Sequence, residues 1–125
     1  MIMPKANIVE KRARMSKRDI IKYQILTHSF INSVSYSQAE IDCLTLLGVC
    51  GEIDLSEFCN YVVDENIFKV SQTARNFLTK AEKMNIIEKK GTSRKKIRLK
   101  QDLKIQTTGN IVLDFKFLYV DTQES

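Results

Sequence analysis

The sequence predicts an α+β domain in which several short helices are followed by a strand hairpin. Apolar residues between positions 16 and 84 recur at helical spacing, in segments separated by polar or glycine-containing breaks. From position 86 to 99 the spacing changes to the alternation typical of two strands around a turn. The chain has 125 residues, of which 43% are hydrophobic, and this suffices for one domain with a core.

Residues 1–18 are predicted to form a basic, extended N-terminal arm. It contains Pro4, the only proline, and six cations that we take as arm contacts: Lys5, Lys11, Arg12, Arg14, Lys17 and Arg18. Such a segment is either an arm that docks on a polyanion or a protein, or a solubilising tail. A helix, or a mixed helix and strand stretch, is expected over residues 16–31 from the apolar residues Ile20, Ile21, Ile25, Leu26 and Phe30.

Two further helices have recognisable start signals. Ser37-Gln38-Ala39-Glu40 has the pattern of a capping box, and Gly48 and Gly51 weaken and end the helix that it opens. Asp54-Leu55-Ser56-Glu57 repeats the start signal. The helix that follows has apolar residues at i, i+3, i+4 and i+7, namely Leu55, Phe58, Cys59 and Val62.

The next helix is expected from Ser71, as its cap, to Met84. Its apolar positions are again spaced i, i+3, i+4 and i+7: Ala74, Phe77, Leu78 and Ala81. Polar residues are left on or near the solvent side: Gln72, Thr73, Arg75, Asn76, Thr79, Lys80 and Lys83. Asn85 tolerates the left-handed conformation that ends a helix.

Two hairpins are expected after this helix. Residues 86–90 begin a strand, residues 91–93 form a turn, and Ile97 and Leu99 alternate with basic residues on the way back. Residues 101–125 are assigned to an additional C-terminal β-hairpin and a short tail, with Leu103 and Ile105 on the incoming strand. The strictly alternating strand 111–120 either closes the preceding sheet, which we prefer, or pairs with a neighbouring subunit.

From Ser37 to Leu99 the chain resembles winged helix-turn-helix domains of the kind found in multiple-antibiotic-resistance-type regulators. The residues that carry the resemblance are the two start signals, the helix 71–84, and Asn85 to Gly91 as the entry into the wing. The fold class is therefore predicted as α+β, a winged helix-turn-helix with an extended N-terminal arm and an extra C-terminal β-hairpin. Regulators of that family dimerise through long terminal helices, whereas this chain has a basic arm at one end and a hairpin at the other.

Positive charge is concentrated in two parts of the chain. The net charge is +5, and residues 69–104 carry twelve of the cations against three acidic residues, while residues 20–68 carry one against seven. Candidate contacts for a nucleic acid or a partner are Gln72, Arg75, Asn76, Thr79, Lys80, Lys83, Arg94, Lys95, Lys96 and Arg98. They either enter a major groove and bind phosphates, or form a solvated helix face and a solvated hairpin.

An enzymatic role is not indicated. The chain has four glycines in no phosphate-loop pattern, a single histidine (His28), and three cysteines without the spacing of a zinc site. We expect no cofactor, metal, membrane contact or small-molecule substrate. The preferred function is a non-enzymatic structural subunit of a multi-protein assembly, with a bacteriophage neck or tail connector as the concrete guess and the virion as its location. The alternative is a cytoplasmic transcriptional regulator that binds double-stranded DNA.

Overall fold

A computed structural model describes residues 5–12, 15–91, 94–109 and 112–119, with side chains for 15–91 and 94–109. The chain divides into two compact units. One comprises residues 16–109, and the other is formed by the two ends of the chain. Arg14, the turn residues Thr92 and Ser93, and the tail 120–125 lie outside the described residues.

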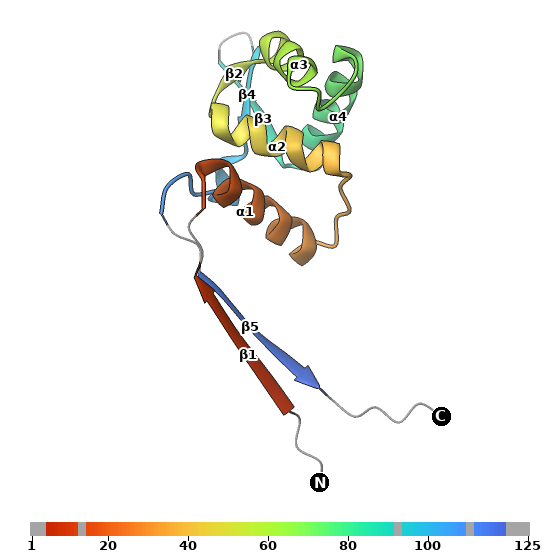
Figure 1. The fold of residues 1–125 in the computed structure, drawn as a ribbon. Coiled ribbons are helices and arrows are strands. Elements are labelled where there is room, and N and C mark those ends of the chain that lie inside the picture. The colour runs from red at the N-terminus through yellow and green to blue at the C-terminus, as the bar shows by residue number, and fades with distance from the viewer. Residues whose placement is uncertain (1–4, 13–14, 92–93, 110–111, 120–125) are drawn as a thin grey trace, which may run out of the picture. The chain divides into compact units, whose positions relative to one another are not determined.

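The larger unit is an α+β arrangement (Figure 1). Its helices are α1 (Lys17–Ile31), α2 (Gln38–Cys50), α3 (Leu55–Asp64) and α4 (Ser71–Lys83). Its antiparallel three-stranded sheet has the order β2-β4-β3, formed by β2 (Ile53–Asp54), β3 (Ile87–Lys90) and β4 (Lys96–Leu99). A short 3-10 turn, Gln101–Leu103, follows β4. No described helix is long and apolar enough to cross a bilayer.

The helix starts follow local side-chain chemistry. Ser16 accepts a hydrogen bond from the Asp19 amide, and the stretch 16–31 is helical rather than mixed. The predicted capping box is confirmed, because Ser37 Oγ and the Glu40 carboxylate each accept the other residue's amide hydrogen. Asp54 caps α3 by accepting from the amides of the second and third helical residues.

The ends of α4 differ in one respect from the prediction. Its N-cap is Val70, and no side chain there hydrogen-bonds the helix amides, so the assignment of Ser71 as the cap was wrong. Ser71 is instead the first helical residue. Asn85 has φ +61° directly after the C-cap, which confirms the predicted left-handed stop.

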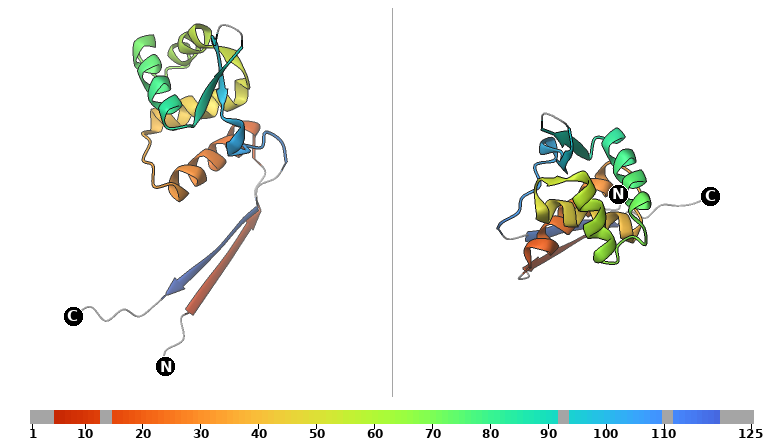
Figure 2. Two further views of the ribbon diagram at one scale, coloured as in Figure 1. Left: turned by 180° about the vertical axis from the view of Figure 1, so that it is seen from behind. Right: turned by 90° about the horizontal axis from the view of Figure 1, so that it is seen from above.

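The core of the larger unit is built around α2, which lies between α1 on one side and α3 and α4 on the other (Figure 2). Leu44, Leu46 and Leu47 are fully buried, as is Phe58 of α3. α1 contributes Ile20, Ile21 and Ile25. α4 contributes the four residues predicted to face inward: Ala74, Phe77, Leu78 and Ala81.

The hairpin after α4 has the predicted form, with one strand added. β3 and β4 pair antiparallel, with Ile87 opposite Leu99 and Glu88 opposite Arg98. The added strand, β2, consists of two residues and pairs with β4 through Ile53 opposite Ile97. Two residues are too few to give a recognisable alternation, so the sequence did not predict this strand.

The smaller unit is a two-stranded antiparallel ribbon of β1 (Lys5–Arg12) and β5 (Val112–Tyr119). Residues 5–12 of the predicted extended arm are the strand β1. Two predictions about the terminal strand are corrected, and the first is its partner, which is β1 and not the segment of Leu103 and Ile105. Leu103 lies in the 3-10 turn instead, and the terminal strand does not close the β2-β4-β3 sheet.

Candidate nucleic-acid or partner interface

The outer face of α4 carries the predicted polar residues. Five of the candidates are exposed: Gln72, Asn76, Thr79, Lys80 and Lys83. Gln72 donates to Asn76 Oδ1 at 2.9 Å, one helical turn away, and Thr79 Oγ1 donates to the carbonyl of Arg75 at 2.9 Å. This face is therefore a polar surface with two exposed lysines, Lys80 and Lys83, at its C-terminal end, where cations complement the helix dipole.

Arg75 has a different environment from its neighbours on α4. It is half-buried, and its guanidinium donates to Ser56 Oγ of α3 at 2.8 Å. The contact joins the start of α3 to the middle of α4. Arg75 therefore serves the packing of two helices, whichever molecule the face of α4 meets.

The cations of the β3–β4 hairpin, like those of α4, include exposed residues and one that is half-buried and paired within the unit. Arg94, Lys95 and Lys96 are exposed, whereas Arg98 is half-buried and its Nε lies 2.7 Å from Glu88 Oε1. On β3, Lys89 and Lys90 are also exposed, and they were not among the predicted contacts although they continue the same charged run. Lys89 Nζ lies 4.0 Å from a carboxylate oxygen of Glu82 on α4, and at this long spacing the ion pair contributes little.

The six cations assigned to the arm do not form one set. Lys17 and Arg18 are exposed residues of the first turn of α1, in the larger unit. Lys5, Lys11 and Arg12 are in β1 of the ribbon, opposite Tyr119, Leu113 and Val112. The arm proposed from the charge pattern is thus a strand followed by the start of a helix.

An apolar stripe on α1 was missed by sequence reasoning. Tyr23, Leu26 and Phe30 fall at i, i+3 and i+7, and they are 43%, 37% and 86% exposed. Ile31 extends the stripe at 73% exposed. Ile21 and Ile25 occupy the opposite, buried side, and Ile20 is buried between the two sides, so the helix is apolar on two faces. The signal in the sequence that could have revealed this stripe is the presence of apolar residues on two faces of one helix.

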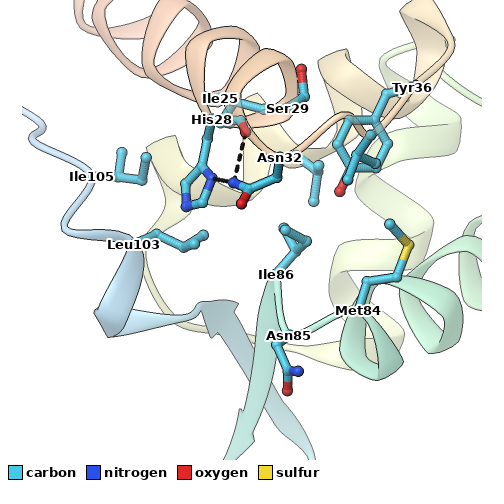
Figure 3. Close-up of a pocket in the computed structure, with 12 residues that line it drawn as sticks. Ile25, His28, Ser29, Asn32, Tyr36, Met84, Asn85, Ile86, Leu103 and Ile105 are labelled. Carbon is cyan, nitrogen blue, oxygen red and sulfur yellow. Dashed lines mark hydrogen bonds between the residues drawn. The ribbon is translucent and has the colours of Figure 1, made fainter.

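A pocket of about 270 Å³ lies within the larger unit, between α1, the segment that joins α1 to α2, and the end of α4 (Figure 3). Its walls include Ile25, Leu44 and Ile86, and the Tyr36 hydroxyl is directed towards it. Among the described residues, nothing hydrogen-bonds this buried hydroxyl. Burial, and then the charge of Glu40, raise the pKa of Tyr36. His28 lines the pocket beside Asn32, with which it pairs.

The three cysteines lie in the core or against it. Cys43 and Cys59 are buried and Cys50 is half-buried. Burial, followed by the nearby Cys59 and Glu40, raises the pKa of Cys43 to about 12. Burial also raises the pKa of Cys50 and Cys59. A raised pKa keeps a thiol protonated and therefore unreactive at neutral pH.

No family model, curated protein or solved structure matches this chain. The described residues define an α+β unit with a basic surface on α4 and the β3–β4 hairpin and with an exposed apolar stripe on α1, and a separate two-stranded ribbon.

Proposed function

We propose that this chain is a non-enzymatic structural subunit of a larger assembly, with a winged-helix domain as its body. The observation that carries the proposal is the apolar stripe of Tyr23, Leu26, Phe30 and Ile31. Soluble monomers seldom expose large contiguous apolar patches, and such patches commonly mark contacts with other proteins. A bacteriophage neck or tail connector is the concrete form of the proposal, with the virion as the location.

The ribbon supports the same role from a second part of the chain. A two-stranded ribbon is marginally stable alone, because it offers one pair of strands and too little apolar surface to bury. Strands β1 and β5 also leave backbone groups on their outer edges that another chain can complete. A subunit that shares its terminal strands with neighbours resolves both problems.

The alternative function is a regulator that binds double-stranded DNA through α4 and the β3–β4 hairpin. The observation that favours it is the exposure of Lys80 and Lys83 on α4, and of Arg94, Lys95 and Lys96 on the hairpin. Exposed cations on two adjacent elements suit phosphate contacts, and Gln72 and Asn76 have side chains that read adenine edges. In a winged-helix domain the hairpin would be the wing.

One fractionation experiment separates the two functions. An epitope-tagged chain is expressed in the cells that naturally make it, and the lysate is separated on a density gradient with and without DNase. The structural role predicts that the chain sediments in large particles that DNase does not dissolve. Release into light fractions by DNase would instead identify the DNA-binding role.

A variant of the stripe makes this test specific. Phe30→Asp together with Ile31→Asp places charge on two exposed side chains, and should move the chain to light fractions without unfolding it. The matched control is Lys69→Asp, which makes the same change of two units in net charge at an exposed position outside α1. Sedimentation of the stripe variant with large particles, as for the native chain, would contradict the proposal.

A further inference from the structure

The outer edge of β5 is the feature of the molecule that its own fold leaves most clearly incomplete. In the described part of the chain, the ribbon contains β1 and β5 only, so β5 is paired along one edge. Its sequence from Val112 to Tyr119 has six apolar residues in eight, with one acid and one base. Native proteins normally block such an edge with charges or cover it, because it is a template for another strand.

The two strands of the ribbon differ in how well they resist further pairing. β1 carries four charged residues among its eight: Lys5, Glu10, Lys11 and Arg12. β5 carries only Asp114 and Lys116. The edge of β5 is accordingly the one suited to a partner strand, and these two charges determine which strand fits it.

The register of the ribbon leaves Asp114 poorly placed. Asp114 is directly opposite Glu10, and like charges at opposite positions destabilise a strand pair. Lys116 is directly opposite Ile8. A strand on the outer edge of β5 that presents a base opposite Asp114 and an acid opposite Lys116 would match both positions.

We propose that this strand is β5 of a second copy of the chain, paired antiparallel about a two-fold axis at Phe115. In that register Asp114 of each copy is opposite Lys116 of the other, and the two ion pairs are related by the symmetry. Three other positions also match in kind: Phe115 is opposite its own counterpart, Leu113 is opposite Phe117, and Val112 is opposite Leu118. The result is a four-stranded sheet in the order β1-β5-β5-β1.

Neighbouring registers do not match. An axis at Asp114 or at Lys116 places like charges opposite each other. An axis at Leu113 puts Asp114 opposite Val112, and an axis at Phe117 puts Lys116 opposite Leu118. A shift that brings odd positions opposite even ones would set the row of Leu113, Phe115, Phe117 and Tyr119 against the charged face of the strand. The charge pattern of β5 thus selects one self-pairing.

The self-pairing deepens the proposed structural role and rests on it. A four-stranded sheet exceeds the three strands that are generally needed for independent stability. The row from Leu113 to Tyr119 shares one face of the strand by its alternation. Pairing two such rows forms a continuous apolar face across the centre of the sheet.

A charge-swap series tests the proposal on the full-length chain. Sedimentation equilibrium, from micromolar to near-millimolar concentration at fixed salt, gives the dimer dissociation constant of the native chain, Asp114→Lys, Lys116→Asp, and the double variant. In each single variant, both of the symmetry-related pairs of positions 114 and 116 bring like charges together. Each single variant should therefore raise the dissociation constant about tenfold or more. The double variant restores both pairs with their signs exchanged, and should recover most of the native affinity.

Mixing the two single variants is the sharpest arm of this experiment. In a mixed dimer both lysines of Asp114→Lys are opposite both aspartates of Lys116→Asp, so an equimolar mixture should associate where each variant alone does not. The controls are Glu65→Lys and Lys69→Asp, which make the same changes of net charge at exposed positions of the larger unit. Circular dichroism checks that each variant is folded.

Three results would overturn the self-pairing. The native chain could stay monomeric throughout the concentration range, or the single variants could dimerise as tightly as the native chain. The third result is an equimolar mixture of the two single variants that dimerises no more tightly than each variant alone. A monomeric result leaves the structural role standing with a different partner, because that role is tested separately by the resistance of the large particles to DNase.

Discussion

Arg98 and Glu88 face each other across the β3–β4 pair, and Arg98 Nε donates to Glu88 Oε1 at 2.7 Å. The two side chains are 18% and 31% exposed, so the pair is partly shielded from water. Arg98 is thus engaged within the hairpin, unlike Lys95 and Lys96. The distinction separates structural cations from those that can meet another molecule.

The Arg98–Glu88 pair should contribute measurably to stability. Arg98→Ala is expected to lower the free energy of unfolding by about 1 kcal/mol, because it removes a charge-assisted hydrogen bond and leaves a partly buried carboxylate. Urea unfolding of Arg98→Ala, Glu88→Ala and the double variant gives the coupling between them. A coupling energy near zero would show that the observed hydrogen bond contributes nothing in solution.

Arg75 and Lys80 should behave differently although both were predicted as contacts. Arg75→Ala removes the bond to Ser56 that joins α3 and α4, and should lower the free energy of unfolding by about 1 kcal/mol. Lys80→Ala changes an exposed side chain and should alter the free energy of unfolding by no more than about 0.5 kcal/mol. Thermal unfolding of the two variants side by side is the measurement, and equal stabilities would refute the packing role of Arg75.

Gly48 permits a close approach between α1 and α2. A Cβ added there would lie 2.7 Å from Ile21 Cγ2 and 3.0 Å from Leu99 Cδ1. Gly48→Ala gains up to about 1 kcal/mol of helix propensity, yet overpacking should cost about 1–3 kcal/mol, so we expect a net loss.

A second substitution shows whether the contact with Ile21 is the cause of that loss. Ile21→Leu removes the β-branched methyl group that the new Cβ would meet, so Gly48→Ala should cost less in the Ile21→Leu background than in the native one. Equal costs in both backgrounds, measured by urea unfolding, would rule out this contact.

The buried thiol of Cys43 should make the protein less stable at alkaline pH. Its pKa is raised from 9.0 to about 12 in the folded state by burial and by Cys59 and Glu40. Between these values the unfolded chain loses a proton that the folded chain retains, so rising pH favours unfolding. Stability from this group is complete below pH 9, and it is lost from there towards pH 12 by at most about 1.4 kcal/mol per pH unit.

Cys43→Ala should reduce the loss of stability with rising pH, independently of the stability that it loses in packing at neutral pH. Cys50→Ala is the control, because that thiol is half-buried and should flatten the decline less. Unfolding midpoints measured from pH 8 upward provide the comparison, and parallel curves for Cys43→Ala and the native chain would exclude Cys43 as the source.

Local signals explain the parts of the fold that the sequence predicted. The capping box at Ser37, the spacing of Ala74, Phe77, Leu78 and Ala81, and the stop at Asn85 each depend on residues within a few positions. The pairing of β1 with β5 joins residues that are 100 or more positions apart, and no local pattern encodes such a register. The exposure of Phe30 was missed because an apolar residue in a helix is normally expected to be buried.

The candidate surface was predictable in composition and only partly in geometry. Gln72, Asn76, Thr79, Lys80 and Lys83 are exposed as the helical period requires. The engagement of Arg75 and Arg98 depends on Ser56 and Glu88, whose positions follow from packing and strand register. Charge in a sequence thus identifies cations without showing which of them the fold already uses.

Duplex binding tests most directly whether protein contacts or DNA contacts are the function of this chain. Fluorescence anisotropy of a labelled random-sequence duplex is measured at low and at physiological salt, for the native chain and for Lys80→Ala combined with Lys95→Ala. The structural role predicts weak binding at low salt, as expected of any chain of net charge +5, and its disappearance at physiological salt. Tight binding at physiological salt that is lost in the double variant would contradict it.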